Sequence, residues 1–224
     1  IKRYTEFLKM VNGEVEKTVP EPHLVYSGIA TAFQSMRKKF DAVDYYTLSL
    51  MFDRRQAVPL TRRAWIFLDD NVALAIRDFE SAKKLSPENA DTLIGLASAY
   101  VRKGLWKEAI HELETARPFA SAQAAEVGPQ AFALFHNSAT VYAGCVTAVA
   151  ADESLTSQLK TERIAEYSDL AVKNLIDAFT VAQTNRIMRQ AMFSAMKTDH
   201  ALMPIHNWPA YQNLSARLAE LIKE

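Results

Sequence analysis

The residues that could do chemistry are few and scattered along the chain. The five histidines are His23, His111, His136, His200 and His206. His200 and His206 lie close to Asp199 and to a proline turn, which raises the question of a metal site. No cysteine and no further carboxylate stands at ligand spacing around them. We therefore interpret the histidines as structural or surface residues, and we expect neither a metal nor a cofactor.

A nucleophile is no better supported by the sequence. Cys145, the single cysteine, lies three residues after Tyr142 among small residues, and no base can be paired with it. A buried structural thiol is therefore the favoured interpretation. The chain also has no P-loop, no GxGxxG and no defensible Ser-His-Asp arrangement. We expect that the protein is not an enzyme.

Charge and composition narrow the choice of partners. Among 224 residues, Lys+Arg and Asp+Glu each count 26, so net charge predicts neither a nucleic acid nor a membrane surface as partner. The basic clusters at 37–39, 54–55 and 62–63 are interpreted as solvated turns and helix ends. No apolar run approaches the ~20 residues that span a bilayer. One cysteine cannot form an internal disulfide, which favours the reducing cytoplasm.

A methionine stripe could be an adaptable binding surface or a buried helix face. Met188, Met192 and Met196 recur every four residues, with Phe193 and Met203 nearby. We favour core packing for these residues, because methionines at helical spacing more often pack against a neighbouring helix.

The elements that would position any site are helices. Only six glycines and long stretches of Ala, Leu, Glu and Lys favour helix almost throughout, and no alternating β-branched run favours a strand. Small residues recur at intervals of 33 or 34, in two series: Ala30, Ala64 and Ala97, and Ala42, Ala75 and Ala109. In the first series the interval of 34 residues precedes that of 33, and in the second series the order is reversed. The loss of one residue from the turn at 68–72 explains this reversal.

This recurrence predicts pairs of antiparallel helices that approach closely where side chains are small. Aromatic residues would fill the remaining space; they are Tyr26, Phe33, Tyr46, Phe67, Phe79 and Tyr100. Gly104 is expected to close the turn inside the third pair. Either Asn89 or Asp91 could cap the helix that begins near residue 90.

The pattern resembles the tetratricopeptide repeat, a helix-turn-helix unit of 34 residues. The best stretch is SPENADTLIGLASAYVRKGLWKEAIHELETA, residues 86–116. The resemblance implies an all-α fold: a right-handed superhelical solenoid of antiparallel helix pairs, with repeats at 23–56, 57–89 and 90–123. Leu93 stands where the family often has Trp, and the first repeat ends at Arg54 without the usual proline.

Residues 129–224 are expected to add a fourth helix pair and a helical cap. Ala139 and Tyr142 repeat the spacing of the earlier pairs, and the partner helix, 158–182, is longer than the family's usual second helix. Further helices at 185–197 and 209–224 would cover the end of the stack, because a terminal repeat otherwise exposes its apolar face.

The two ends of the chain suggest a larger context. Residues 197–218, KTDHALMPIHNWPAYQNLSARL, resemble the tail that follows these repeats in some bacterial Ser/Thr kinases of the planctomycete type. No kinase motif is present in the chain. Residues 1–22 predict a short N-terminal helix and a linker. Since the first residue is Ile, we expect a processed product or part of a longer protein.

In the repeat family the first helix of each pair lines a concave groove. The resemblance implies that this groove consists of Ser27, Thr31, Gln34, Thr61, Trp65, Leu68, Ile94, Ser98, Val101, Arg102, His136, Asn137 and Thr140. Trp65 is its natural aromatic anchor. Ser27 and Thr31 stand where family members that grip chaperone C-termini have Lys and Asn, which disfavours that ligand.

The sequence therefore predicts a non-enzymatic protein–protein interaction module that takes a peptide or helix of a protein partner in the groove. One alternative is the regulatory or substrate-docking region of a larger bacterial Ser/Thr kinase or signalling protein. A second is self-assembly, in which a terminal repeat pairs with another copy to give a homo-oligomer.

Overall fold

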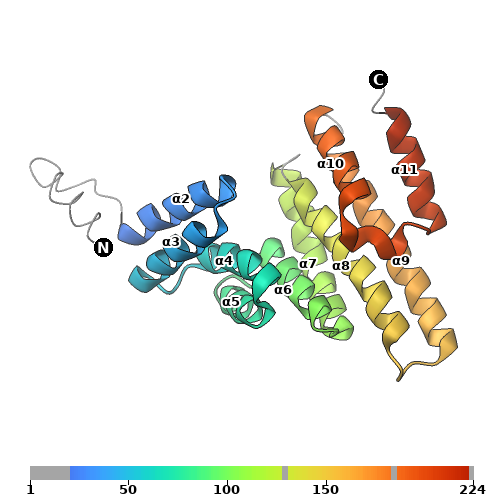
Figure 1. Cartoon of the computed structure of the whole chain (residues 1–224), viewed down its shortest axis with the longest axis horizontal. Coiled ribbons are helices and arrows are strands. Elements are labelled where there is room, and N and C mark those ends of the chain that lie inside the picture. Colours follow the sequence, from blue (N-terminus) through green and yellow to red (C-terminus); the bar gives the residue numbers. More distant parts are fainter. Residues whose placement is uncertain (1–20, 128–130, 183–185, 222–224) are drawn as a thin grey trace, which may run out of the picture. The chain divides into compact units, whose positions relative to one another are not determined.

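The computed structural model describes residues 21–127, 131–182 and 186–221, and this part of the chain is helical without a strand. The predicted helix within residues 1–20 lies outside the described residues. The elements are α2 (Pro22–Ser35), α3 (Lys39–Phe52), α4 (Ala57–Asp70), α5 (Val72–Leu85), α6 (Ala90–Arg102), α7 (Trp106–Val127), α8 (Phe132–Ala151), α9 (Ser157–Ala182), α10 (Arg186–Thr198), the 3-10 helix η2 (His200–Ile205) and α11 (Pro209–Leu221) (Figure 1). They fall into two compact units, Ile1–Pro59 and Leu60–Glu224.

The first unit contains one antiparallel pair, α2 and α3. Tyr26 stacks on Phe52 with ring centroids 5.5 Å apart, and Phe33 stacks on Tyr45 at 5.3 Å. The start of α2 therefore meets the end of α3, and the helices run in opposite directions. Ala30, predicted to allow close approach of the two helices, is fully buried.

The second unit begins with the pair α4 and α5. Ala64 and Ala75, one from each helix, are fully buried in the same apolar cluster. The ring of Trp65 meets that of Phe79 edge to face, with centroids 5.6 Å apart. Only Asn71 separates α4 from α5, whereas three residues separate α2 from α3 and α6 from α7. The shortened turn that the repeat intervals predicted is therefore present.

The next pair, α6 and α7, follows the predicted pattern most closely. Ala97 and Ala109 are fully buried. The side chain of Asn89 accepts a hydrogen bond from the backbone N–H of Thr92 at 2.9 Å, so Asn89 rather than Asp91 is the N-cap of α6. Gly104 has a φ of 73° in the turn, a conformation that glycine adopts without steric cost.

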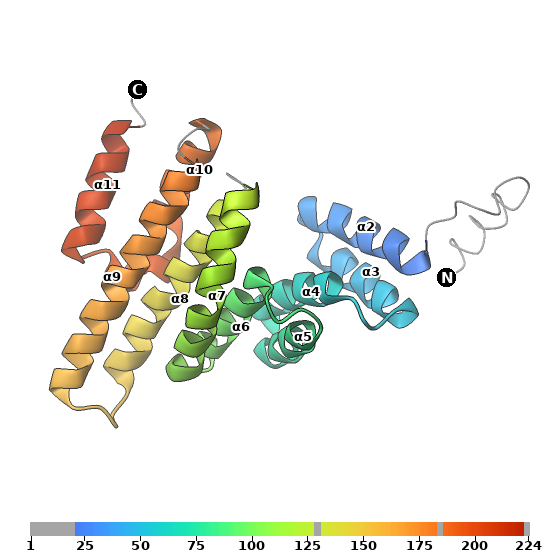
Figure 2. The ribbon, with the colours of Figure 1, turned by 180° about the vertical axis from the view of Figure 1, so that it is seen from behind.

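The fourth pair, α8 and α9, carries much of the core. Tyr142 on α8 is buried and packs against Tyr167 on α9 with ring centroids 6.3 Å apart. At 26 residues, α9 exceeds the 14 residues of α5, as expected from the sequence. Figures 1 and 2 both show α7, α8 and α9 side by side.

The C-terminal elements α10, η2 and α11 cover the end of this stack. Met192, Met196, Leu202, Ile205 and Leu218 are at most 1 % exposed and belong to the same apolar cluster as α6 to α9. Core packing is thus confirmed for Met192 and Met196, two members of the methionine stripe. The all-α fold of successive antiparallel helix pairs, closed by C-terminal helices, is also confirmed.

Candidate functional site

The first helices of the pairs in the second unit meet around one groove of about 620 Å³. The helices α4, α6 and α8 contribute to it, and η2 forms a further wall. Seven residues predicted for the groove line it: Trp65, Leu68, Ser98, Val101, Arg102, Asn137 and Thr140. The repeat positions thus brought together side chains that are up to 75 residues apart in the sequence.

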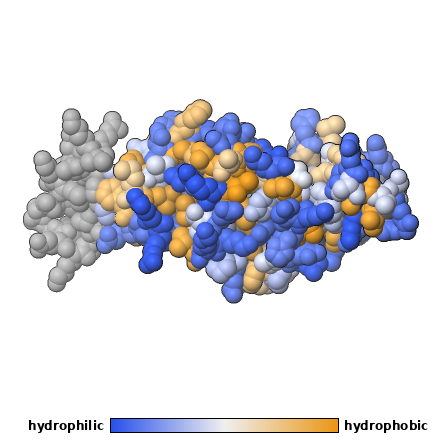
Figure 3. All heavy atoms as spheres, turned by 90° about the horizontal axis from the view of Figure 1, so that it is seen from below, coloured by the Kyte–Doolittle hydropathy of each residue, from blue (hydrophilic) through white to orange (hydrophobic). Residues whose placement is uncertain are grey.

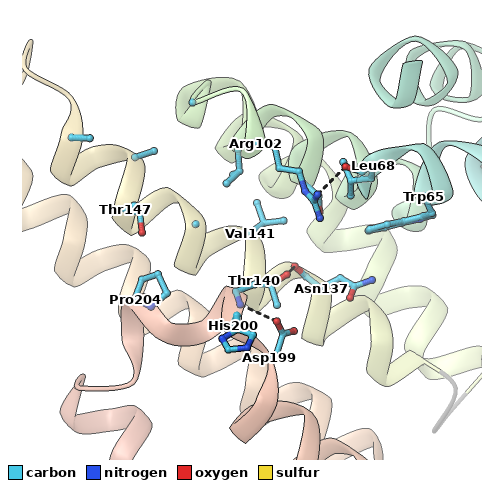
Figure 4. A pocket seen from close by; sticks show the side chains of 17 residues that line it. Trp65, Leu68, Arg102, Asn137, Thr140, Val141, Thr147, Asp199, His200 and Pro204 are labelled. Atoms are coloured by element: carbon cyan, nitrogen blue, oxygen red, sulfur yellow. Dashed lines mark hydrogen bonds between the residues drawn. The ribbon is translucent and has the colours of Figure 1, made fainter. Parts of the chain in front are cut away.

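Figure 4 shows the arrangement of these side chains. Trp65 and Leu68 approach from α4, and His200 and Pro204 approach from η2. Val141 lies on α8 between them. The groove therefore has a floor of α8 and walls from both sides of that helix.

The two fully charged groups of the lining are held by neighbouring groups of the chain. A guanidinium N–H of Arg102 donates to the carbonyl oxygen of Leu68 at 2.8 Å, and another lies 3.4 Å from the carboxylate of Asp69. The carboxylate of Asp199 accepts from the backbone N–H of Ala201 at 2.9 Å and lies 3.0 Å from Nε2 of His136. Arg102 and Asp199 thus have partners before any ligand arrives.

Trp65 is fixed in the groove wall by a hydrogen bond. Its indole N–H donates to a carboxylate oxygen of Asp91 at 3.1 Å. Burial raises the pKa of Asp91, while the charge of Arg62 and the bond from Trp65 act in the opposite direction. Because the indole N–H is already engaged, Trp65 offers a ligand only its apolar ring.

Six predicted groove residues do not line this groove. Thr61 and Ile94 are buried in the packing of α4 and α6, and the hydroxyl groups of Thr61 and Thr92 lie 2.7 Å apart. His136 is 8 % exposed and lies below the groove, against Asp199. The remaining three, Ser27, Thr31 and Gln34, lie in the first unit, where the hydroxyl of Tyr46 donates to the side-chain oxygen of Gln34 at 2.8 Å.

Sequence reasoning missed the C-terminal half of α8 and the η2 wall. The missed lining residues are Val141, Gly144, Thr147, Ala148, Ala151, Asp199, His200, Ala201 and Pro204, together with Gly104 in the turn after α6. Their signal was the unusual length of the helix at 132–151, since a 20-residue helix extends the floor beyond the standard repeat positions. The wall could not be placed from spacing, because η2 follows the last repeat.

The other residues considered for catalysis or metal binding, Cys145, His200 and His206, do not form a reactive site in the described residues. Burial raises the pKa of the Cys145 thiol to about 12, as fits a structural thiol. His200 is exposed, and the His206 ring stacks on Tyr211 with centroids 4.9 Å apart. Within the described residues, no group of three His, Cys, Asp or Glu side chains converges to hold a metal ion.

Surface hydrophobicity does not by itself identify a second site. Phe40 and Ile187 are 85 and 77 % exposed. On the face seen in Figure 3, hydrophobic residues are interspersed with hydrophilic ones. Single exposed apolar residues are common on folded proteins. Every helix in the described ranges is too short or too polar to cross a bilayer.

Comparison with known families and structures agrees with this architecture. The family model described as tetratricopeptide repeat matches residues 67–127, which include the end of α4 and all of α5, α6 and α7. This segment of the chain is therefore similar to the tetratricopeptide repeat, the family that the sequence pattern resembles. No curated protein matches the sequence.

Two solved structures share the fold at low sequence identity. The crystal structure of MamA protein is 14 % identical, with a TM-score of 0.50 over 89 % of this chain and 93 % of that one. PilF of Pseudomonas aeruginosa is 15 % identical, with a TM-score of 0.53 over 91 % of this chain and 85 % of that one. These likenesses establish a common fold and no more. The kinase resemblance of residues 197–218 stays a prediction.

Proposed function

We propose that this protein is a non-enzymatic interaction module whose concave groove binds a peptide or helix of a protein partner. The observation that carries the proposal is the convergence of seven predicted groove residues, together with η2, on a single groove of about 620 Å³. Tetratricopeptide repeats suggest a protein-interaction scaffold, and the groove supplies a surface on which a partner could be held.

The chemistry of the groove supports binding rather than catalysis. Its lining is largely apolar, with a small number of polar groups, which is typical of ligand-binding clefts. Trp65 is the largest apolar side chain in it, and aromatic residues of this kind often contribute most of the binding energy at an interface. His136 is buried against Asp199 and does not line the groove, and His200, which does line it, has no cysteine, serine or second histidine paired with it by a hydrogen bond in the described residues.

Site-specific photocrosslinking in extract of the source cell tests this proposal. A photoreactive amino acid is placed at Ser98 or Thr140, both in the groove, and in separate variants at Glu114 or Glu162, exposed positions that do not line it. We expect one crosslinked protein from both groove positions and none from the two outer positions. Trp65→Ala in the same background should remove the crosslink.

The outcome separates the groove from other surfaces. If the same partner crosslinks only from Glu114 or Glu162, the partner binds elsewhere and the groove assignment is wrong. If crosslinks from Ser98 survive Trp65→Ala at full yield, the partner does not use the aromatic wall, and the proposed site must again be abandoned.

A further inference from the structure

We infer that the occupant of the groove is an uncharged, extended peptide segment of about four residues that carries bulky apolar side chains. The inference rests on the proposed function and deepens it by naming the chemistry of the partner. It is argued from the charges, the uncommitted polar groups, the size and the contour of the groove.

The charge of the lining fits an uncharged ligand. Arg102 is engaged by the Leu68 carbonyl and Asp69, and Asp199 by the Ala201 N–H and His136. A ligand carboxylate or ammonium group would lose water of hydration in the groove without gaining a counter-ion that is not already paired. Matching of charge across an interface governs which partners are accepted, so segments without charge are favoured.

Two polar side chains on the floor, those of Asn137 and Thr147, are available to a ligand. The hydroxyl of Ser98 donates to the Ile94 carbonyl at 2.9 Å, and that of Thr140 to the Asn137 carbonyl at 2.8 Å. By contrast, the carboxamide of Asn137 and the hydroxyl of Thr147 make no side-chain hydrogen bond with another described residue. A carboxamide both donates and accepts, as a peptide unit does, so Asn137 can pair with a ligand backbone.

These free groups favour an extended ligand over a helix. The backbone groups in the body of a helix are bonded to one another, whereas an extended chain presents its N–H and C=O groups outward. Asn137 and Thr147 are ten residues apart on α8, or about 15 Å at 1.5 Å per residue. An extended segment of four to five residues spans about 13–17 Å and can reach both.

The volume of the groove predicts the same length for the ligand segment. An extended chain of ~4.8 by 10 Å cross-section occupies about 160 Å³ per residue. The groove of about 620 Å³ therefore accommodates roughly four residues. A helix of 10–12 Å diameter fills about 500 Å³ per turn, so the groove would hold little more than one turn, which is too short to be stable.

The contour of the floor leaves room for large ligand side chains. Two small residues, Ala148 and Ala151, bring only methyl groups to the floor of α8, while Trp65 and Pro204 form apolar walls. At Gly144 the missing side chain makes room for Val101 instead. Bulky apolar side chains of the ligand would occupy the space above the small residues and contact both walls. Burial of apolar area at such a contact is the main favourable contribution to binding.

A pair of displayed random-peptide libraries tests the inference on the full chain. In one library the random segment is flanked on both sides, and in the other it ends in a free carboxylate. Enriched sequences are then synthesised with a fluorophore and blocked ends, and their affinities are measured at 50 and 500 mM NaCl. We expect uncharged sequences with at least two bulky apolar residues, enriched from the flanked library, whose affinity changes less than twofold with salt.

Variants with matched controls locate the binding. Trp65→Ala should weaken binding about thirtyfold and Asn137→Ala about tenfold. Leu159→Ala and Asn213→Ala, at exposed positions that do not line the groove, should leave affinity unchanged. Because Trp65 also packs against Phe79, Thr147→Glu is a second groove variant at an exposed position, and its new charge should weaken binding at least tenfold.

The results distinguish this inference from the proposed function. Charged peptides whose affinity collapses at 500 mM NaCl, but which still require Trp65, would retain the groove and overturn the uncharged ligand. Peptides that bind all three groove variants as tightly as the native chain would overturn both. Failure of the flanked library to yield binders tighter than 100 µM would overturn the short-segment ligand and leave the groove to the crosslinking experiment.

Discussion

Nε2 of His136 lies 3.0 Å from a carboxylate oxygen of Asp199, which joins the middle of the stack to the start of η2. Because a carboxylate only accepts, the imidazole N–H is the donor. The other carboxylate oxygen of Asp199 caps η2 by accepting from the N–H of Ala201 at 2.9 Å. A residue predicted as a ligand contact instead supports a wall of the groove from below.

His136→Ala should therefore loosen η2. We expect a loss of about 1–3 kcal/mol in the free energy of unfolding, because a hydrogen bond to a charged partner is removed from a largely buried site. Amides of residues 200–205 should exchange with deuterium faster than in the native chain. His111→Ala, at an exposed position on α7, serves as the control. Unchanged exchange in η2 would mean that Leu202 and Ile205, both fully buried, hold it unaided.

The role of His136 illustrates what spacing can and cannot predict. Recurring alanines such as Ala97 and Ala109 identified the helix pairs, since close helix packing demands small residues at fixed intervals. The family resemblance, carried over residue by residue, implied a groove that includes Trp65, and Trp65 lines the groove of the second unit. The resemblance misassigned His136 because the partner, Asp199, is 63 residues away in a segment that follows no repeat. A contact with a residue outside the repeats cannot be predicted from the repeat spacing.

A buried ion pair joins α4 to α5. Arg63 donates to both oxygens of Asp78 at 2.7 and 3.1 Å, and the Asp78 side chain is only 3 % exposed. Asp78→Leu should cost about 3–5 kcal/mol, because Arg63 then stays largely buried without this carboxylate. The double variant Arg63→Met/Asp78→Leu should regain most of that loss. Denaturant unfolding measures both; a double variant as unstable as the single one would contradict this account.

Gly95 permits a close approach of the Phe79 ring of α5 to α6. A methyl group at Gly95 would overlap the ring of Phe79, which is fully buried. Gly95→Ala should therefore destabilise the protein by about 1–3 kcal/mol through overpacking. Gly28→Ala is the matched control, since a methyl group there meets nothing within 4 Å, and it should stabilise α2 by about 0.5–1 kcal/mol. Thermal unfolding measures both variants, and a lower Tm for Gly28→Ala as well as for Gly95→Ala would contradict the packing argument.

Arg37 occupies the position that Gly104 occupies two repeats later. Its φ of 58° is in the left-handed region, as is the 73° of Gly104. This conformation costs an L-residue about 1–2 kcal/mol, whereas glycine adopts it freely. Arg37→Gly should raise the free energy of unfolding of the first unit by about 1 kcal/mol, and Gly104→Ala should lower that of the second. Denaturation curves in which the two substitutions have the same sign would count against this explanation.

Alkaline pH should destabilise the second unit. Burial raises the pKa of Cys145 from 9.0 to about 12, and that of Tyr142 and Tyr167 from 10.0 to about 12. Between these values the unfolded chain has released protons that the folded chain retains, so stability falls as pH rises. The stability contributed by these groups is complete below about pH 9 and is lost as pH approaches 12.

Urea unfolding at pH 8.0, 9.5 and 10.5 measures this dependence, and Cys145→Ala isolates the thiol. The variant removes the group that titrates first in the unfolded chain, so its stability should fall less steeply than that of the native chain between pH 8.0 and 9.5. Any constant loss from the missing sulfur shifts the whole curve and leaves its slope unaffected. Parallel curves for the two proteins over that interval would mean that Cys145 ionises as readily in the folded chain as in the unfolded one.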